Sequence, residues 1–138
     1  MGFVSARELA AQGYHTIIAC RSAERGAAAL QKLQAGNPQG SFGLETLDLA
    51  SLATVRDLTK KLVDAGTPID VLLNNAGVMA TPEMKTQEGH EFQLGVNHLG
   101  HFALTAGLMP LLTQHERCVS CSPALVARAV RRRVKHRA

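Results

Sequence analysis

Ten residues, Asp70–Met79, constrain most strongly what this chain can fold into. Three apolar residues, Val71 to Leu73, are followed at once by Asn74, Asn75 and Gly77. Apolar residues on consecutive positions bury both faces of a strand, as a central parallel strand covered by helices requires. Ligands of open α/β sheets bind at the carboxyl ends of such strands. The stretch therefore predicts a binding site, although an ordinary Asn-Gly-type turn after a strand would have the same sequence.

The composition fits one soluble α/β domain. The chain has 138 residues, 46% hydrophobic and 4% aromatic. Its longest apolar run, 102–112, falls short of the roughly 20 residues of a membrane span and contains Pro110. Arg7 and Glu8 interrupt the apolar residues near the N-terminus, unlike a signal peptide. We expect a soluble intracellular protein, cytoplasmic or in an organelle.

The charge is distributed unevenly along the chain. Residues 1–116 hold eight Lys and Arg and all 11 acidic residues, a net charge of −3, whereas residues 117–138 carry +7. No aromatic platform accompanies the basic tail, which favours a solvated segment over one that binds nucleic acid or an anionic membrane. We therefore predict a folded domain at 1–122 and a disordered tail at 123–138.

Apolar periodicity alternates between strand and helix along the chain, as in α/β folds. Ser22 is suited to cap the second helix, and Pro110 marks the expected end of the last one. The pattern predicts strands at 15–20, 42–47, 71–75 and 117–122, and helices at 2–12, 22–33, 51–64 and 87–112.

Three spaced motifs point to one family. They are Leu47-Asp48-Leu49, Asn74-Asn75-Ala76-Gly77 and Val96-Asn97-His98-Leu99-Gly100-His101-Phe102. Together they resemble the short-chain dehydrogenase/reductases, and the wording from Thr81 to Phe102 is closest to the branch of retinol dehydrogenase and protochlorophyllide reductase. The resemblance runs from Gly2 to about Ser122. It implies a three-layer, doubly wound parallel Rossmann-like sheet that lacks the first strand, the glycine-rich turn and the C-terminal part.

The resemblance also implies which residues bind a nicotinamide cofactor. Arg21 ends a predicted strand where the family distinguishes NAD from NADP, and a guanidinium suits the extra phosphate of NADP(H). A solvated arginine at the end of a strand is the alternative. The cofactor-binding positions implied are Gly2, Arg21, Asp48, Leu49, Asn75, Ala76 and Gly77.

The catalytic positions are incomplete. Asn97 matches the family's helical Asn, and Ser122 matches the first of two serines, but Pro123 occupies the second. The family's Tyr-x-x-x-Lys pair is absent, because the single tyrosine, Tyr14, has no Lys four residues on. The parent reaction is NADP(H)-linked hydride transfer to or from a carbonyl, alcohol or conjugated double bond. We expect this chain to be inactive; a non-catalytic nucleotide-binding or dimerisation module is the alternative.

Partners and metals follow from the same residues. The family often uses the helix at 87–112 as a dimer interface, so a homo-oligomer is expected, together with a small hydrophobic carbonyl or alcohol substrate. Cys118 and Cys121, and His98 and His101, have spacings that metals can use, but no further ligand stands at matching spacing. We predict no metal site.

The missing first strand has a physical consequence. In the family it lies between the strands predicted at 15–20 and 71–75. Strands lie about 4.8 Å apart, so its absence leaves a gap near 10 Å that backbone hydrogen bonds cannot bridge. We expect the two strands either to pair directly or to leave the chain molten.

Overall fold

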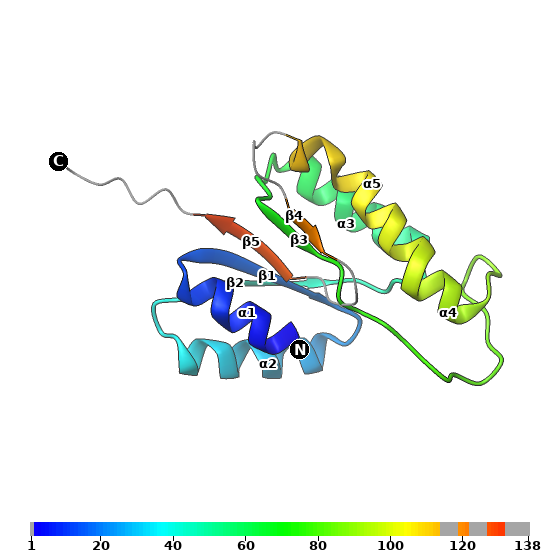
Figure 1. Ribbon diagram of the computed structural model, residues 1–138, viewed down its shortest axis with the longest axis horizontal. Helices are drawn as coiled ribbons and strands as arrows, with labels where there is room; N and C mark the ends of the chain where they lie inside the picture. The colour runs from blue at the N-terminus through cyan, green and yellow to red at the C-terminus, as the bar shows by residue number, and fades with distance from the viewer. Residues whose placement is uncertain (1, 114–118, 122–126, 132–138) are drawn as a thin grey trace.

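The computed structural model describes residues 2–113, 119–121 and 127–131. One five-stranded sheet, in the order β2-β1-β5-β3-β4, lies between two layers of helices (Figure 1). Helices α1 and α2 cover one face, and α3 and α5 cover the other. The elements are α1 Gly2–Ala11, β1 Tyr14–Cys20, α2 Ala23–Gly36, β2 Ser41–Thr46, α3 Leu52–Asp64, β3 Val71–Leu73, α4 Phe92–Leu94, the π-helix η1 Gly95–Gly100, α5 His101–Leu112, β4 Val119–Cys121 and β5 Ala127–Arg131. The α/β class is confirmed.

The first half of the chain forms a β-α-β unit. Strand β1 pairs in parallel with β2, from His15 opposite Ser41 to Cys20 opposite Thr46. The predicted N-cap of α2 is confirmed, because the Ser22 hydroxyl accepts the N–H of Arg25 at 3.2 Å. This helix continues three residues past its predicted end and stops at Gly36.

The helix predicted at 87–112 is shorter and differently built. It begins at Phe92, because the Glu91 carboxylate accepts the N–H groups of Gln93 and Leu94 at 2.8 and 2.7 Å and caps it there. Before it, the chain turns through Gly89 at a φ of 84°. At the other end the helix runs through Pro110 and stops at Leu112, so the proline lies inside its last turn.

Helices α3 and α5 pack closely over strand β3. Leu58, Leu62, Leu104 and Leu108 are buried between these helices and the sheet, together with Leu72. Glycines permit the close approach: a Cβ on Gly107 would meet the Thr59 side chain at 2.8 Å. In the described ranges, no helix is long and apolar enough to cross a membrane.

The gap expected between β1 and β3 is filled. Strand β5, from the basic tail, lies there and pairs antiparallel with both neighbours. Its register with β1 runs from Tyr14 opposite Arg131 to Ile18 opposite Ala127, and with β3 it places Arg128 opposite Leu72. The expected direct pairing of the strands at 15–20 and 71–75 is therefore wrong, because β5 lies between them. A molten chain and a disordered tail at 123–138 stay predictions. The domain boundary at residue 122 stays a prediction.

The physical reason is the hydrogen-bonding demand of two facing strand edges. Any extended segment that carries free N–H and C=O groups can meet that demand in either direction. The sheet is consequently mixed, with β5 running against its four parallel strands.

Removal of β5 should expose the edges of β1 and β3. We expect a chain ending at residue 126 to exchange the amides of these strands faster by at least about tenfold, because their hydrogen bonds open to water. Hydrogen–deuterium exchange read by NMR measures this. A chain ending at residue 131 is the matched control and should keep the protection. Unchanged exchange after removal of 127–138 would contradict the pairing.

Gly100 should tolerate no side chain. A Cβ there would lie 2.6 Å from the backbone oxygen of Leu49, which has no flexible side-chain end to move aside. We expect Gly100→Ala to destabilise the fold by about 1–3 kcal/mol in urea denaturation. Gly36→Ala is the control, since nothing lies within 4 Å of its Cβ position. It should be neutral or stabilising by up to about 1 kcal/mol.

Candidate nucleotide-binding site

A cavity of about 240 Å³ opens at the carboxyl ends of the parallel strands. Its walls come from the end of β1, from the segments after β2 and after β3, and from α4 and η1. The structure thus brings together segments that are more than fifty residues apart in the sequence. The lining residues are Ala19, Cys20, Arg21, Leu47, Asp48, Leu49, Ala76, Gly77, Val78, Phe92 and Val96.

Arg21 supplies a positive charge at this cavity. Its side chain is exposed, and the structure gives it no hydrogen bond or ion pair within the described ranges. The next residue, Ser22, begins helix α2 as its N-cap. The backbone of Arg21 is therefore held between the end of β1 and the start of α2, while the N–H donors of its guanidinium remain available to an anion.

Cys20 lines the same cavity on the side of α2. Its Sγ donates to the backbone oxygen of Ser22 at 3.2 Å. Burial raises the pKa of the thiol, against a smaller lowering by that hydrogen bond. The thiol is consequently a polarisable, uncharged part of the cavity wall at neutral pH.

Asp48 has a structural task and a spare oxygen. Its Oδ1 accepts the N–H of Ala50 at 2.9 Å. The backbone oxygen of Asp48 accepts a hydrogen bond from the Thr54 hydroxyl at 2.7 Å. The second carboxylate oxygen has no hydrogen bond to the part of the chain described. Asp48 therefore stabilises the turn into α3 and can also accept a hydrogen bond from a ligand.

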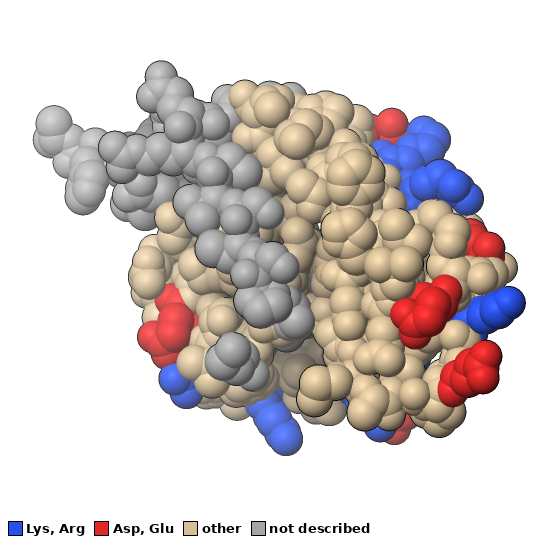
Figure 2. All heavy atoms as spheres, turned by 45° about the vertical axis from the view of Figure 1, so that its right-hand side comes forward, with Lys and Arg blue, Asp and Glu red and all other residues tan. Residues whose placement is uncertain are grey.

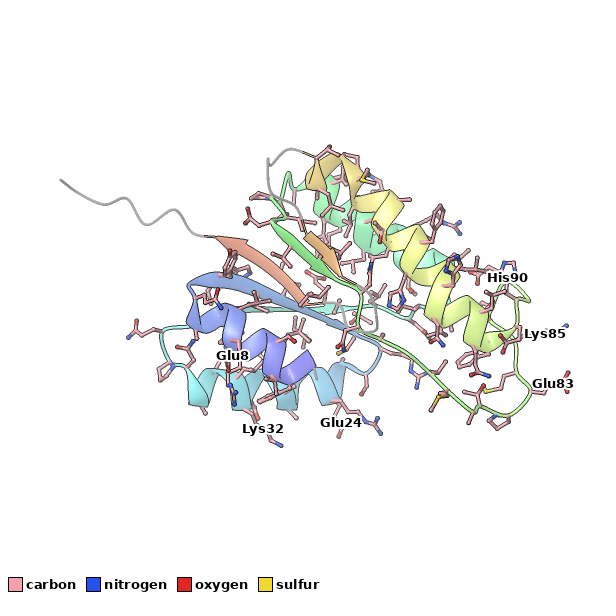
Figure 3. All side chains as sticks on the ribbon, in the orientation of Figure 1. Glu8, Glu24, Lys32, Glu83, Lys85 and His90 are labelled. Atoms are coloured by element: carbon pink, nitrogen blue, oxygen red, sulfur yellow. The ribbon has the colours of Figure 1, made fainter. Side chains whose placement is uncertain are left out.

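A distant loop caps helix α3. The carboxylate of Glu88 accepts the Leu52 N–H at 2.6 Å, and the Ser51 hydroxyl donates to Gln87 at 2.8 Å. A carboxylate at this position also opposes the positive end of the helix dipole. Figure 3 shows the neighbouring Glu83, Lys85 and His90 on the same loop before α4, far from α2. Through these hydrogen bonds, the loop before α4 is attached to the start of α3.

Asn97 holds the loop after β3. Its side-chain Oδ1 accepts the N–H of Val78 at 2.8 Å, and its Nδ2 donates to the Val78 oxygen at 2.8 Å. Asn97 lies in the π-helix, a form of helix that often occurs at functional sites. In the loop that Asn97 holds, Ala80 lies two residues after Val78 and has a φ of 52°, a strained value for a residue with a Cβ. The amide thus fixes one wall of the cavity.

Two more polar residues continue the row that Asn97 begins. His101 and Thr105 follow at intervals of four residues, which places all three on one side of the helix. Thr105 accepts a bond from Asn74 at 3.0 Å, and Nδ1 of His101 bonds to the backbone oxygen of Asn97 at 3.0 Å. The sequence analysis missed this row, although polar residues at a spacing of four in an apolar helix were a visible signal.

The predicted site residues are brought together in part. Arg21, Asp48, Leu49, Ala76 and Gly77 all line the cavity. Two predicted positions are not among its lining residues: Gly2, the buried first residue of α1, and Asn75, which follows β3. Ser122 lies outside the described residues, as does Cys118.

The outer surface of α5 carries exposed apolar side chains. Phe102 and Met109 are 68% and 48% exposed. Figure 2 shows a face of the molecule whose charged side chains lie mainly toward the edges of a broad uncharged area. A homo-oligomer through this helix stays a prediction. Among the described residues, no group of three His, Cys, Asp or Glu is placed to hold a metal ion.

Comparison with known proteins identifies the family. Residues 1–119 match the family described as short chain dehydrogenase. The chain belongs to this family.

Curated relatives of this chain include retinol and polyprenol dehydrogenases. The chain is 40% identical to polyprenol dehydrogenase of Danio rerio, over 91% of this chain and 39% of the relative. It is 41% identical to retinol dehydrogenase 13 of Homo sapiens, over 81% of this chain and 34% of the relative. The resemblance to the retinol-dehydrogenase branch is confirmed, and the chain spans little more than a third of these relatives.

Solved structures agree on the fold. An uncharacterized protein from Mycobacterium paratuberculosis is 44% identical and superimposes with a TM-score of 0.69 over 80% of this chain and 38% of the other. The RhlG/NADP complex of Pseudomonas aeruginosa is 28% identical, with a TM-score of 0.66 over 86% of this chain and 48% of the other. The Rossmann-like fold predicted from the resemblance is confirmed, for part of its extent.

The reaction rate of the Cys20 thiol with an alkylating reagent tests its burial in the cavity wall. Because burial raises the pKa of its thiol, little thiolate is present near pH 8, and the folded chain should react with iodoacetamide more slowly than the urea-unfolded chain. Mass spectrometry of the peptide that contains Cys20 measures the two rates. A ligand in the cavity should slow the folded chain further. Equal rates in folded and unfolded chain would contradict the burial.

Proposed function

We propose that this chain binds the adenosine part of NADP(H) in the cavity and represents the nucleotide-binding part of a short-chain oxidoreductase. The observation that carries the proposal is Arg21, a cation at the cavity that has no partner among the described residues. A guanidinium offers two parallel donors, which suit the oxygens of a 2′-phosphate. The family uses a nicotinamide cofactor, and NADP is the form that this charge favours.

The rest of the cavity fits an adenine and its ribose. The spare oxygen of Asp48 can accept from an exocyclic amino group, as a carboxylate accepts at up to two oxygens. Leu47, Ala76 and Phe92 provide apolar walls for a flat ring. Gly77 has no side chain, so a ligand can approach its backbone closely. The polar and apolar parts of the cavity thus match the two faces of a nucleoside.

The reaction proposed for the whole protein is hydride transfer between a nicotinamide and an alcohol, a carbonyl or a conjugated double bond. When bound, the nicotinamide would supply the carbon that accepts hydride from an alcohol or, in its reduced form, donates hydride to a carbonyl or a conjugated double bond. The names of the relatives, retinol and polyprenol dehydrogenase, favour a long apolar alcohol as substrate. Asn97 would hold the cavity wall at Val78 in place.

Loss of the positive charge at residue 21 should remove the preference for the 2′-phosphate. We expect Arg21→Ala to weaken binding of 2′,5′-ADP by roughly 10- to 100-fold, as expected for a charge-assisted hydrogen bond of about 1.5–3 kcal/mol. Binding of 5′-AMP should change little. Isothermal titration calorimetry of both nucleotides measures this.

Arg25→Ala is the matched control, because Arg25 is an exposed arginine on the first turn of α2 outside the cavity lining. It should leave both affinities unchanged. If Arg21→Ala weakened neither nucleotide, or weakened both equally, the assignment of the 2′-phosphate site would be wrong.

The 138 residues alone should not turn over. General acid–base catalysis needs a group that can exchange a proton with the substrate oxygen. In the family a tyrosine performs that step. The single tyrosine of this chain, Tyr14, begins strand β1 and does not occupy that position. We expect no NADP(H)-dependent oxidation of retinol or reduction of retinal above a buffer blank, in an absorbance assay at 340 nm. Sustained turnover by chain freed of other oxidoreductases would refute this expectation.

A further inference from the structure

Two buried polar atoms near the cavity wall have no hydrogen-bond partner in the described part of the chain. They are Oδ1 of Asn74, at the end of β3, and Nε2 of His101, at the start of α5. Both residues are 7% exposed. Buried polar atoms are paired in the great majority of cases, so each such atom calls for a specific explanation.

The two residues are tied to the same turn of helix α5. The Thr105 hydroxyl donates to the backbone oxygen of His101 at 2.8 Å and accepts from Nδ2 of Asn74 at 3.0 Å. Side chains on a helix lean toward its N-terminus, so Thr105 lies over the turn of His101. The Thr105 hydroxyl therefore links the Asn74 amide to the backbone oxygen of His101.

The hydrogen-bond network fixes the chemistry of both free atoms. Because the Thr105 hydrogen goes to the His101 oxygen, Thr105 must accept from Asn74, which leaves the Asn74 oxygen as the free atom. The Asn97 oxygen can only accept, so Nδ1 of His101 carries the hydrogen. In the neutral ring Nε2 is then an acceptor as well. Two acceptors cannot bond to each other, so each of these atoms calls for a donor from another group.

We propose that Asn74 and His101 bind one buried water molecule, which donates one hydrogen to Oδ1 of Asn74 and the other to Nε2 of His101. A water is the smallest group with two donors, and both residues are closed to solvent. Buried waters commonly satisfy polar groups in this way.

The water would complete a row of three attachments between the helix and the segment after β3. Asn97 holds Val78, and Thr105 holds the Asn74 side chain. The bond of the proposed water to His101 would lie between these two attachments, because His101 lies between Asn97 and Thr105 on the helix. Ala76, Gly77 and Val78 line the cavity, so Asn74 and His101 act as positioning residues for its wall. This consequence rests on the proposed nucleotide site, whereas the water site itself does not.

NMR of the unaltered chain, labelled with ¹⁵N, tests the proposal directly. We expect the His101 ring in the Nδ1–H tautomer, with Nε2 shifted as a hydrogen-bond acceptor. A cross-peak should link a long-lived water to the His101 ring or the Asn74 side-chain amide. The Nε2–H tautomer, or no water signal at either group, would overturn the proposal. Neither result depends on whether a nucleotide binds.

A double-mutant cycle gives a second measurement, on chains that melt cooperatively. With a shared water, Asn74→Leu and His101→Phe should each lower the folding equilibrium constant, and the second replacement should cost at least fivefold less once the first is made. Thr105→Val is the control for the bond that Asn74→Leu also loses. Without a water, each apolar replacement removes an unsatisfied acceptor, so unchanged or raised folding constants with additive effects would overturn the proposal.

Discussion

The whole sheet depends on the backbone groups of β1 and β3 that face each other. Strand β1 is otherwise paired with β2 alone, and β3 with β4 alone, in the part of the chain described. An unpaired buried backbone group costs about 1–3 kcal/mol, and a domain is stable by only about 5–15 kcal/mol. A strand between β1 and β3 is therefore a condition for the fold. Here β5 fulfils it, and the pairs that it makes join the two halves of the molecule.

The register of β5 shows what backbone pairing can and cannot specify. Hydrogen bonds accept any residue, so an antiparallel segment serves as well as a parallel one. In this register Arg128 of β5 stands opposite both Ile17 of β1 and Leu72 of β3. The hydrogen bonds of the backbone therefore let β5 pair with both strands, whatever residues it contains.

Local physical chemistry made much of the fold predictable. Ser22 as a cap, the β-branched residues of β1 and the apolar run Val71–Leu73 each act within a few residues of chain, and each was correctly assigned. The errors lie where distant segments decide. Helix 87–112 begins late because Glu91 caps it, and the role of residues 127–131 depends on two strand edges that local periodicity does not contain.

The candidate site shows the same difference between features that a short stretch of sequence carries and features that arise only when distant segments pack. Arg21, Asp48 and Gly77 were found because family motifs carry them, and the structure places them on one cavity. The contributions of Cys20 and Phe92 could not be read, since a cavity wall arises only when the segments pack. His101 was noticed for its spacing with His98, yet His98 is exposed while His101 is buried beside Asn97. Burial, rather than spacing, separates the two histidines.

The position of the cavity couples ligand binding to the sheet. Ala19, Cys20 and Arg21 come from the β1 side, whereas Ala76 and Val78 come from the β3 side. A ligand that contacts both walls joins the same two halves that β5 joins, at the carboxyl end of the strands. A ligand that binds only the folded state adds about 2.7 kcal/mol of stability at a concentration 100 times its Kd. That is comparable with the cost of one or two unpaired backbone groups. A nucleotide bound in this cavity, as proposed, would therefore stabilise the same interface as the central strand, and would offset a weakness in the pairing of that strand.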